Sequence, residues 1–146
     1  MDDLQALIAT PATRVLVIDD SNTIRRSAEI FLRQGGHEVV LAEDGFDALA
    51  KVNDHAPQLI FCDILMPRLD GYQTCAIIKR NPKFAHVPVI MLSSKDGLFD
   101  KARGRMVGSE DYLTKPFTKD QLLRAVQQFG GAVAFDGGAV DTVPDA

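Results

Sequence analysis

The chain has 146 residues, of which 46% are apolar and 25% are charged, a length and composition typical of one globular domain with a real core. A net charge of −4 argues against a nucleic-acid-binding role, and no apolar run is long enough to cross a bilayer. The acidic N-terminus does not resemble an export signal. Cys62 and Cys75 are expected to be small, reduced residues of the core. The reduced cysteines and the lack of an export signal or a membrane span predict a cytoplasmic protein without membrane insertion.

Short apolar runs alternate with amphipathic segments along the chain. In chain order we expect a strand over residues 14–19, a helix over 23–34, a strand over 38–42, a helix over 45–54, a strand over 58–62, a helix over 71–81, a strand over 87–92, a helix over 98–107, a strand over 110–114 and a helix over 118–129. Five strands, each followed by a helix, indicate βαβ units and a doubly wound parallel α/β sheet. Residues 14–129 form the predicted domain, with an N-terminal extension over 1–13 and a flexible glycine-rich tail over 130–146.

Two local patterns predict details of the helices. Phe46, Leu49 and Ala50 are expected to face inward from the second helix. Thr118 and Gln121 have the spacing of a capping box, which predicts that the last helix begins there.

Polar side chains gather where the predicted strands end. Parallel strands present their carboxyl ends at one edge of a sheet, and ligands of open α/β sheets bind at that edge. The residues found there are Asp19 and Asp20 after the first strand, Asp63 after the third, Ser93 and Ser94 after the fourth, and Lys115 and Pro116 after the fifth.

These residue types suit one chemistry together. Crowded carboxylates repel one another unless a cation is present, and oxygen ligands suit Mg²⁺. A metal beside a carboxylate permits phosphoryl transfer onto it, with lysine and serine available to bind phosphoryl oxygens. Taken singly, each residue has an ordinary structural explanation: Asp20 or Ser21 could cap a helix, and Lys115–Pro116 could be a loop.

At this point the motifs resemble a known family. The runs VLVIDDS, DILMPRLDG, the Ser93–Ser94 pair and YLTKPF are similar to the receiver domain of two-component response regulators. The resemblance covers residues 14–129 and implies a flavodoxin-like (βα)5 fold with strand order 2-1-3-4-5.

The resemblance also implies roles for residues at the acidic edge. Asp63 is the phosphoacceptor, and Asp19 and Asp20 bind Mg²⁺, or Mn²⁺ in its place, together with Asp63 and the backbone carbonyl of Leu65. Lys115 pairs with the phosphoryl group.

Further roles concern the switch and the loops. Ser93 is the hydroxyl that binds the phosphoryl group, and Tyr112 is an aromatic switch that turns inward on activation. Pro67 and Gly71 shape the loop after the acceptor, and the peptide before Pro116 is cis.

A closer resemblance concerns the runs DGFDALAK, PRLDGYQTCAIIK and MLSSKDGLFDKARGRMVGSEDYLTKPF. They look like single-domain regulators of the chemotaxis-like system that controls type IV pili and twitching motility. Leu65 and Lys95 depart from the familiar chemotaxis regulator beside the phosphoryl site, which predicts slow self-dephosphorylation.

We therefore expect a response regulator, not an enzyme, that accepts a phosphoryl group from a histidine kinase. It is expected to signal to a downstream motility protein through the face formed by residues 98–129. Within signalling, the alternative is a phosphate sink for a shared kinase. A phosphatase-like hydrolase fits the sequence less well, because such enzymes need a second acid as general acid and Leu65 stands at that position. A flavin carrier also fits less well, because Asp19 and Asp20 would repel the phosphate of the flavin.

Overall fold

The computed structural model describes residues 12–94 and 99–130. The predicted N-terminal extension and C-terminal tail fall almost entirely outside these ranges, as does Lys95. Within the described ranges, none of the helices has the length and apolar character that a bilayer crossing requires.

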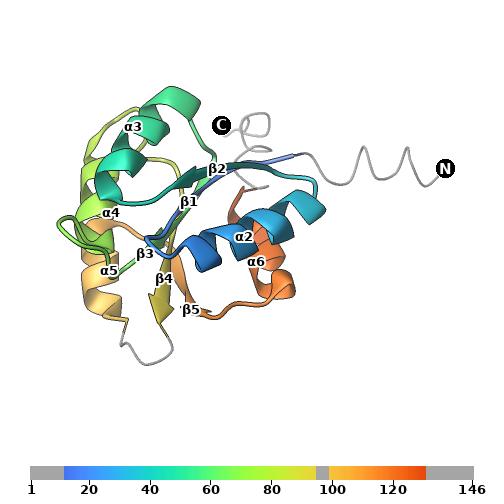
Figure 1. The fold of residues 1–146 in the computed structure, drawn as a ribbon. Helices are drawn as coiled ribbons and strands as arrows, with labels where there is room; N and C mark the ends of the chain where they lie inside the picture. The colour runs from blue at the N-terminus through green and yellow to red at the C-terminus, as the bar shows by residue number, and fades with distance from the viewer. Residues whose placement is uncertain (1–11, 95–98, 131–146) are drawn as a thin grey trace, which may run out of the picture.

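The described chain forms one parallel sheet covered by helices on both faces (Figure 1). The strands are β1 (Arg14–Ile18), β2 (Glu38–Ala42), β3 (Leu59–Asp63), β4 (Val89–Ser94) and β5 (Asp111–Lys115). The helices are α2 (Asn22–Gln34), α3 (Gly45–His55), α4 (Gly71–Arg80), α5 (Lys101–Val107) and α6 (Lys119–Ala125), followed by a π-helical turn η1 (Val126–Gly130). The strand order β2-β1-β3-β4-β5 confirms the predicted flavodoxin-like topology.

The direction of winding reverses between β1 and β3. From β1 the chain moves outward to β2, then returns across the sheet to β3 and continues outward through β4 to β5. The register aligns the carboxyl ends, because Ile18 pairs with Cys62 and Asp63 with Leu92. Residues that follow β1 therefore lie beside the end of β3, where a ligand site is expected.

Alternate residues of the strands point to opposite faces of the sheet and pack into two separate apolar cores. On one face Leu16 and Ile18 pack beneath α3, α4 and α5, and on the other Val15 and Val17 pack beneath α2 and α6. Strands buried on both faces read as continuous apolar runs, which is why they were visible in the sequence. Both cysteines are buried and free.

The predicted orientation of α3 is wrong in part. Phe46 is 54% exposed and Ala50 is exposed, whereas Ala48 is fully buried. The buried face of α3 is formed by Gly45, Ala48 and Val52, and Phe46 lies outside that face. There the guanidinium of Arg68 covers the Phe46 ring, 5.2 Å from its centroid.

Among the strands and helices before β5, the boundaries differ most from the prediction at β4 and α5. β4 begins at Val89 because Pro88 has no N–H and Val87 closes a turn onto the carbonyl of Phe84. Pairing of Ser93 with Thr114 and of Ser94 with Lys115 in β5 extends the strand, so Ser93 lies within it. α5 begins at Lys101, capped by the side chain of Asp100.

The last helix begins as predicted and ends earlier. Thr118 is its N-cap, and the reciprocal hydrogen bonds with Gln121 confirm the capping box. The α-helix then gives way at Val126 to the π-helical turn η1, which buries Val126 and Gly130.

Candidate functional site

Three acids converge at the carboxyl edge of the sheet. Asp63 is the last residue of β3 and Asp19 directly follows β1, and both are buried, whereas Asp20 is exposed. Each offers a carboxylate oxygen, and these atoms lie within 4.8 Å of one another. The structure thus brings together the three acids that the sequence placed at strand ends.

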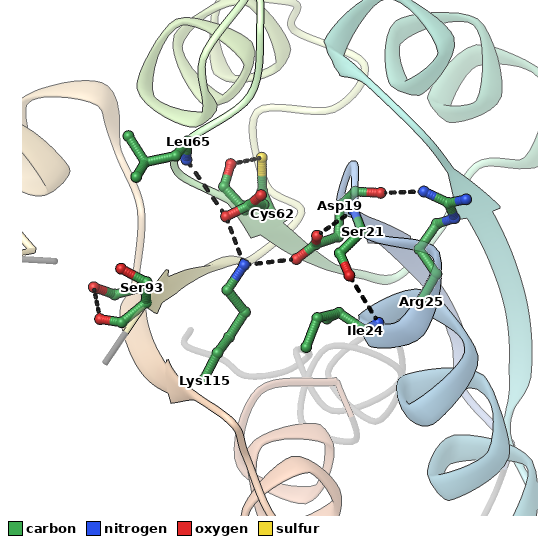
Figure 2. Close-up of polar contacts among 10 residues, drawn as sticks. Asp19, Ser21, Ile24, Arg25, Cys62, Leu65, Ser93 and Lys115 are labelled. Carbon is green, nitrogen blue, oxygen red and sulfur yellow. Dashed lines mark hydrogen bonds and ion pairs between the residues drawn. The ribbon is translucent and has the colours of Figure 1, made fainter. Parts of the chain in front are cut away.

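Lys115 bridges the two buried acids. Its Nζ donates to Oδ2 of Asp19 and to Oδ1 of Asp63, each at 3.0 Å, and its side chain is only 14% exposed (Figure 2). Lys115 is the last residue of β5, and the peptide that joins it to Pro116 is cis. One ammonium therefore faces three carboxylates.

The surroundings of Asp63 disfavour the ionised form of its carboxyl group. Burial, followed by the charge of Asp19, raises the pKa of Asp63 to about 6, although the hydrogen bond and charge of Lys115 act in the opposite direction. Burial works to lower the pKa of Lys115, but the contacts with Asp63 and Asp19 outweigh it and the pKa is raised. An excess of crowded carboxylate oxygens over cations fits a hard divalent ion such as Mg²⁺.

The turn between β1 and α2 is closed by three hydrogen bonds. The amide of Ser21 donates to Asp19 Oδ1 at 2.8 Å, and its hydroxyl accepts from the amide of Ile24 as the N-cap of α2. The guanidinium of Arg25 donates to the backbone carbonyl of Asp19 (Figure 2). No local sequence pattern indicates this contact, because only the folded turn brings Arg25 to that carbonyl.

The loop after Asp63 is compact. The amide of Leu65 lies 3.4 Å from Asp63 Oδ1, while the side chain points away from the carboxylates and is 68% exposed (Figure 2). The carbonyl of Pro67 accepts from the amide of Leu69 at 2.7 Å, and the amide of Gly71 donates to the carbonyl of Ile64 at 2.8 Å. The role of the Leu65 carbonyl as a metal ligand stays a prediction.

The two residues expected to switch lie on the neighbouring strands β4 and β5. Ser93 is buried, and its hydroxyl donates to the carbonyl of Ser94 at 3.4 Å (Figure 2). Tyr112 is half-buried on β5, where its ring stacks on Phe99. Sequence reasoning missed Phe99 and its second neighbour, Tyr72, because a stacking contact between distant segments leaves no local pattern.

Known proteins are similar to this chain in sequence and in fold. The family model of the response regulator receiver domain matches residues 15–127. Protein PilG of Pseudomonas aeruginosa is 66% identical over 114 residues, which cover 78% of this chain and 84% of PilG.

Solved structures of receiver proteins have a similar fold. Chemotaxis protein CheY4 of Vibrio cholerae is 31% identical with a TM-score of 0.77, covering 82% of this chain and 99% of that chain. The receiver domain of the sensor histidine kinase PA1611 from P. aeruginosa, solved with a magnesium ion in its active-site cleft, is 29% identical with a TM-score of 0.75, covering 83% of this chain and 99% of that chain. This chain belongs to the response regulator receiver family.

Proposed function

We propose that Asp63 accepts a phosphoryl group from a phosphohistidine of a partner kinase. The observation that carries the proposal is the buried Asp63 carboxylate, which lies with Asp19 and Asp20 on one side and the Lys115 ammonium at 3.0 Å. In the transfer, an Asp63 oxygen forms a bond to phosphorus while the phosphorus–nitrogen bond breaks. The bonding electron pair returns to the imidazole, and the aspartyl phosphate remains on this chain.

The pocket's own residues position this reaction. Asp19 and Asp20 would hold Mg²⁺ together with Asp63 and the Leu65 carbonyl, and Mn²⁺ would suit the same oxygen ligands. The chemistry that such an ion would supply is neutralisation of charge on the phosphoryl oxygens. Lys115 supplies a second positive charge from β5, and Ser93 a hydroxyl from β4.

The output passes through protein contact. Ser93 and Tyr112 bias a two-state element, since a remote effect requires that phosphorylation favour one of two conformations. The described part of the predicted face, residues 99–129, includes a hollow of about 310 Å³ lined by Phe99, Lys101, Arg105 and Tyr112 among others. Met106, also on α5, is 85% exposed.

We infer that the partner is a motility protein of the chemotaxis-like system that controls type IV pili, and that the chain works in the cytoplasm. The support is the likeness of the chain to PilG and to a chemotaxis protein. Apart from slow loss of its own phosphoryl group, we propose no enzymatic activity.

The test is labelling by acetyl phosphate in Mg²⁺, followed by phosphate-affinity electrophoresis. Asp63→Asn should remove the labelled species, whereas Asp54→Asn, at an exposed position of α3, should not. Excess chelator should abolish labelling of the wild type. Labelling of Asp63→Asn at the wild-type level would overturn the assignment.

A second experiment separates signalling from a phosphate sink. The labelled and unlabelled proteins are each used to capture partners from the native cell. A motility protein retained only by the labelled form supports an output role. Transfer from the kinase without such a partner favours the sink.

A further inference from the structure

Both tyrosines of the chain lie in one aromatic stack, and the chain has no tryptophan. The Phe99 ring lies between them, with its centroid 4.4 Å from that of Tyr112 and 6.1 Å from that of Tyr72. Both pairs are nearly parallel, with 20° between the ring planes. The stack joins the start of α4 and the residues before α5 to the edge strand β5 (Figure 1).

One end of the stack is fixed. Tyr72 is 5% exposed, and its hydroxyl accepts a 3.0 Å hydrogen bond from the amide of Asp100. The guanidinium of Arg103 lies 4.3 Å from the centre of the Tyr72 ring. The residue before Tyr72 is Gly71, which packs against the backbone of Asp63. The fixed ring is therefore anchored beside the phosphoacceptor.

Phe99 connects this fixed ring to a less restrained one. Tyr112 is half-buried, and its other close aromatic or cationic neighbour among the described residues is Lys101, whose Nζ lies 5.9 Å from the ring centre. The Phe99 ring also rests on Gly104 of α5, where a Cβ atom would overlap the ring. The Phe99 ring thus contacts α5 as well as the two tyrosine rings.

We propose that Phe99 is a positioning residue that holds Tyr112 in the conformation of the unphosphorylated chain. The inference rests on the proposed function, in which Tyr112 turns inward on activation. Turning inward separates Tyr112 from Phe99, and an aromatic pair of this kind biases an equilibrium by about two- to tenfold. Because coupling is reciprocal, a chain without the Phe99 ring takes the activated conformation more readily and binds a phosphoryl group more tightly.

The experiment titrates the full chain with beryllofluoride, a phosphoryl analogue, in Mg²⁺. Selectively labelled tyrosine gives two ring signals in an NMR spectrum, and both report on the stack. Phe99→Leu keeps an apolar side chain against Gly104 but removes the ring. The control is Phe31→Leu, which removes an aromatic contact to Phe117, with ring centroids 6.5 Å apart, on the opposite face of the sheet.

We expect Phe99→Leu to bind beryllofluoride with a midpoint about two- to tenfold lower than wild type. The change of the tyrosine signals with analogue concentration gives the midpoint, and Phe31→Leu should have the wild-type midpoint. An unchanged or higher midpoint in Phe99→Leu overturns this inference alone. Failure of the wild type to bind the analogue overturns the proposed function instead.

Discussion

Gly71 packs so closely against Asp63 that a Cβ atom at Gly71 would overlap the Asp63 carbonyl oxygen. The overlapping atom is backbone, so no side-chain rotation relieves it. We expect Gly71→Ala to lower the free energy of unfolding by about 1–3 kcal/mol and to slow phosphorylation, because the strand end that carries the acceptor must shift. Denaturant unfolding and acetyl phosphate labelling measure the two effects. Arg80→Ala, at the exposed end of the same helix, is the control, and wild-type labelling of Gly71→Ala would contradict the prediction.

Lys115 compensates the pocket when no metal is bound. In chelator, Lys115→Met should lower the free energy of unfolding by about 3 kcal/mol, because Asp19 and Asp63 lose the cation between them. Mg²⁺ should then raise the melting temperature of the variant more than that of wild type, since the ion replaces the missing charge. Thermal melts with and without Mg²⁺ measure this effect. An equal rise of the melting temperature in both proteins would show that Lys115 and the metal do not neutralise the same carboxylates.

The raised pKa of Asp63 predicts a pH dependence of stability. Its pKa is about 6 in the folded chain, against a usual 3.8, so the folded state binds more protons than the unfolded state between these values. The metal-free protein therefore loses stability as the pH rises from about 4 through 6. Asp63→Asn should be more stable than wild type at pH 8, by up to about 3 kcal/mol, and equal to it at pH 4. Melts at both values in chelator test this, and a difference that persists at pH 4 would rule out ionisation as the cause.

His37 contributes with the opposite sign. Burial lowers its pKa, and its Nδ1 accepts a 3.1 Å hydrogen bond from the amide of Thr13, which only an unprotonated Nδ1 can do. The unfolded state takes up the proton first, so this contribution is present above the usual pKa and is lost as the pH falls through it. His37→Gln should remove about 1 kcal/mol at pH 8 and flatten the change between pH 7 and 5. His86→Gln, at an exposed position, should leave the profile unchanged.

Leu65 is expected to prolong the life of the aspartyl phosphate. Its amide lies 3.4 Å from Asp63 Oδ1, so its side chain begins beside the acceptor, yet it has no atom that can orient an attacking water. Leu65→Asn should lose phosphoryl label severalfold faster than wild type. The measurement is decay of label after removal of the phosphodonor, for both proteins together. Equal decay would leave the lifetime to an external phosphatase or to transfer back to the kinase.

The acidic site could be predicted because it depends on topology. β1, β3 and β4 are apolar runs, each of the five strands is followed by a helix, and parallel strands end at one edge. Asp19, Asp63 and Lys115 follow from that placement without any knowledge of side-chain packing. The predicted strand over residues 87–92 differs from β4 at both ends, because Pro88 delays its start and pairing with β5 extends it to Ser94.

Packing between segments could not be predicted in this way. The inward face of α3 is the one on which Gly45 contacts Leu69 and Thr74, and Phe46 lies outside that face. The stack of Phe99 between Tyr72 and Tyr112 joins residues that no helical or strand period relates. Such contacts are tertiary, and only the assembled fold reveals them.

The position of Asp63 in the sheet sets how a signal can leave it. β3 is hydrogen-bonded to β1 on one side and β4 on the other, whereas β5 pairs with β4 alone in the described sheet. Local opening needs more free energy at the middle of a sheet than at its margin, so amide hydrogens of β3 should exchange with solvent last and those of β5 earlier. On the proposed function, phosphorylation of Asp63 therefore takes place on a strand that opens less readily, and the response develops at β5, where Tyr112 lies.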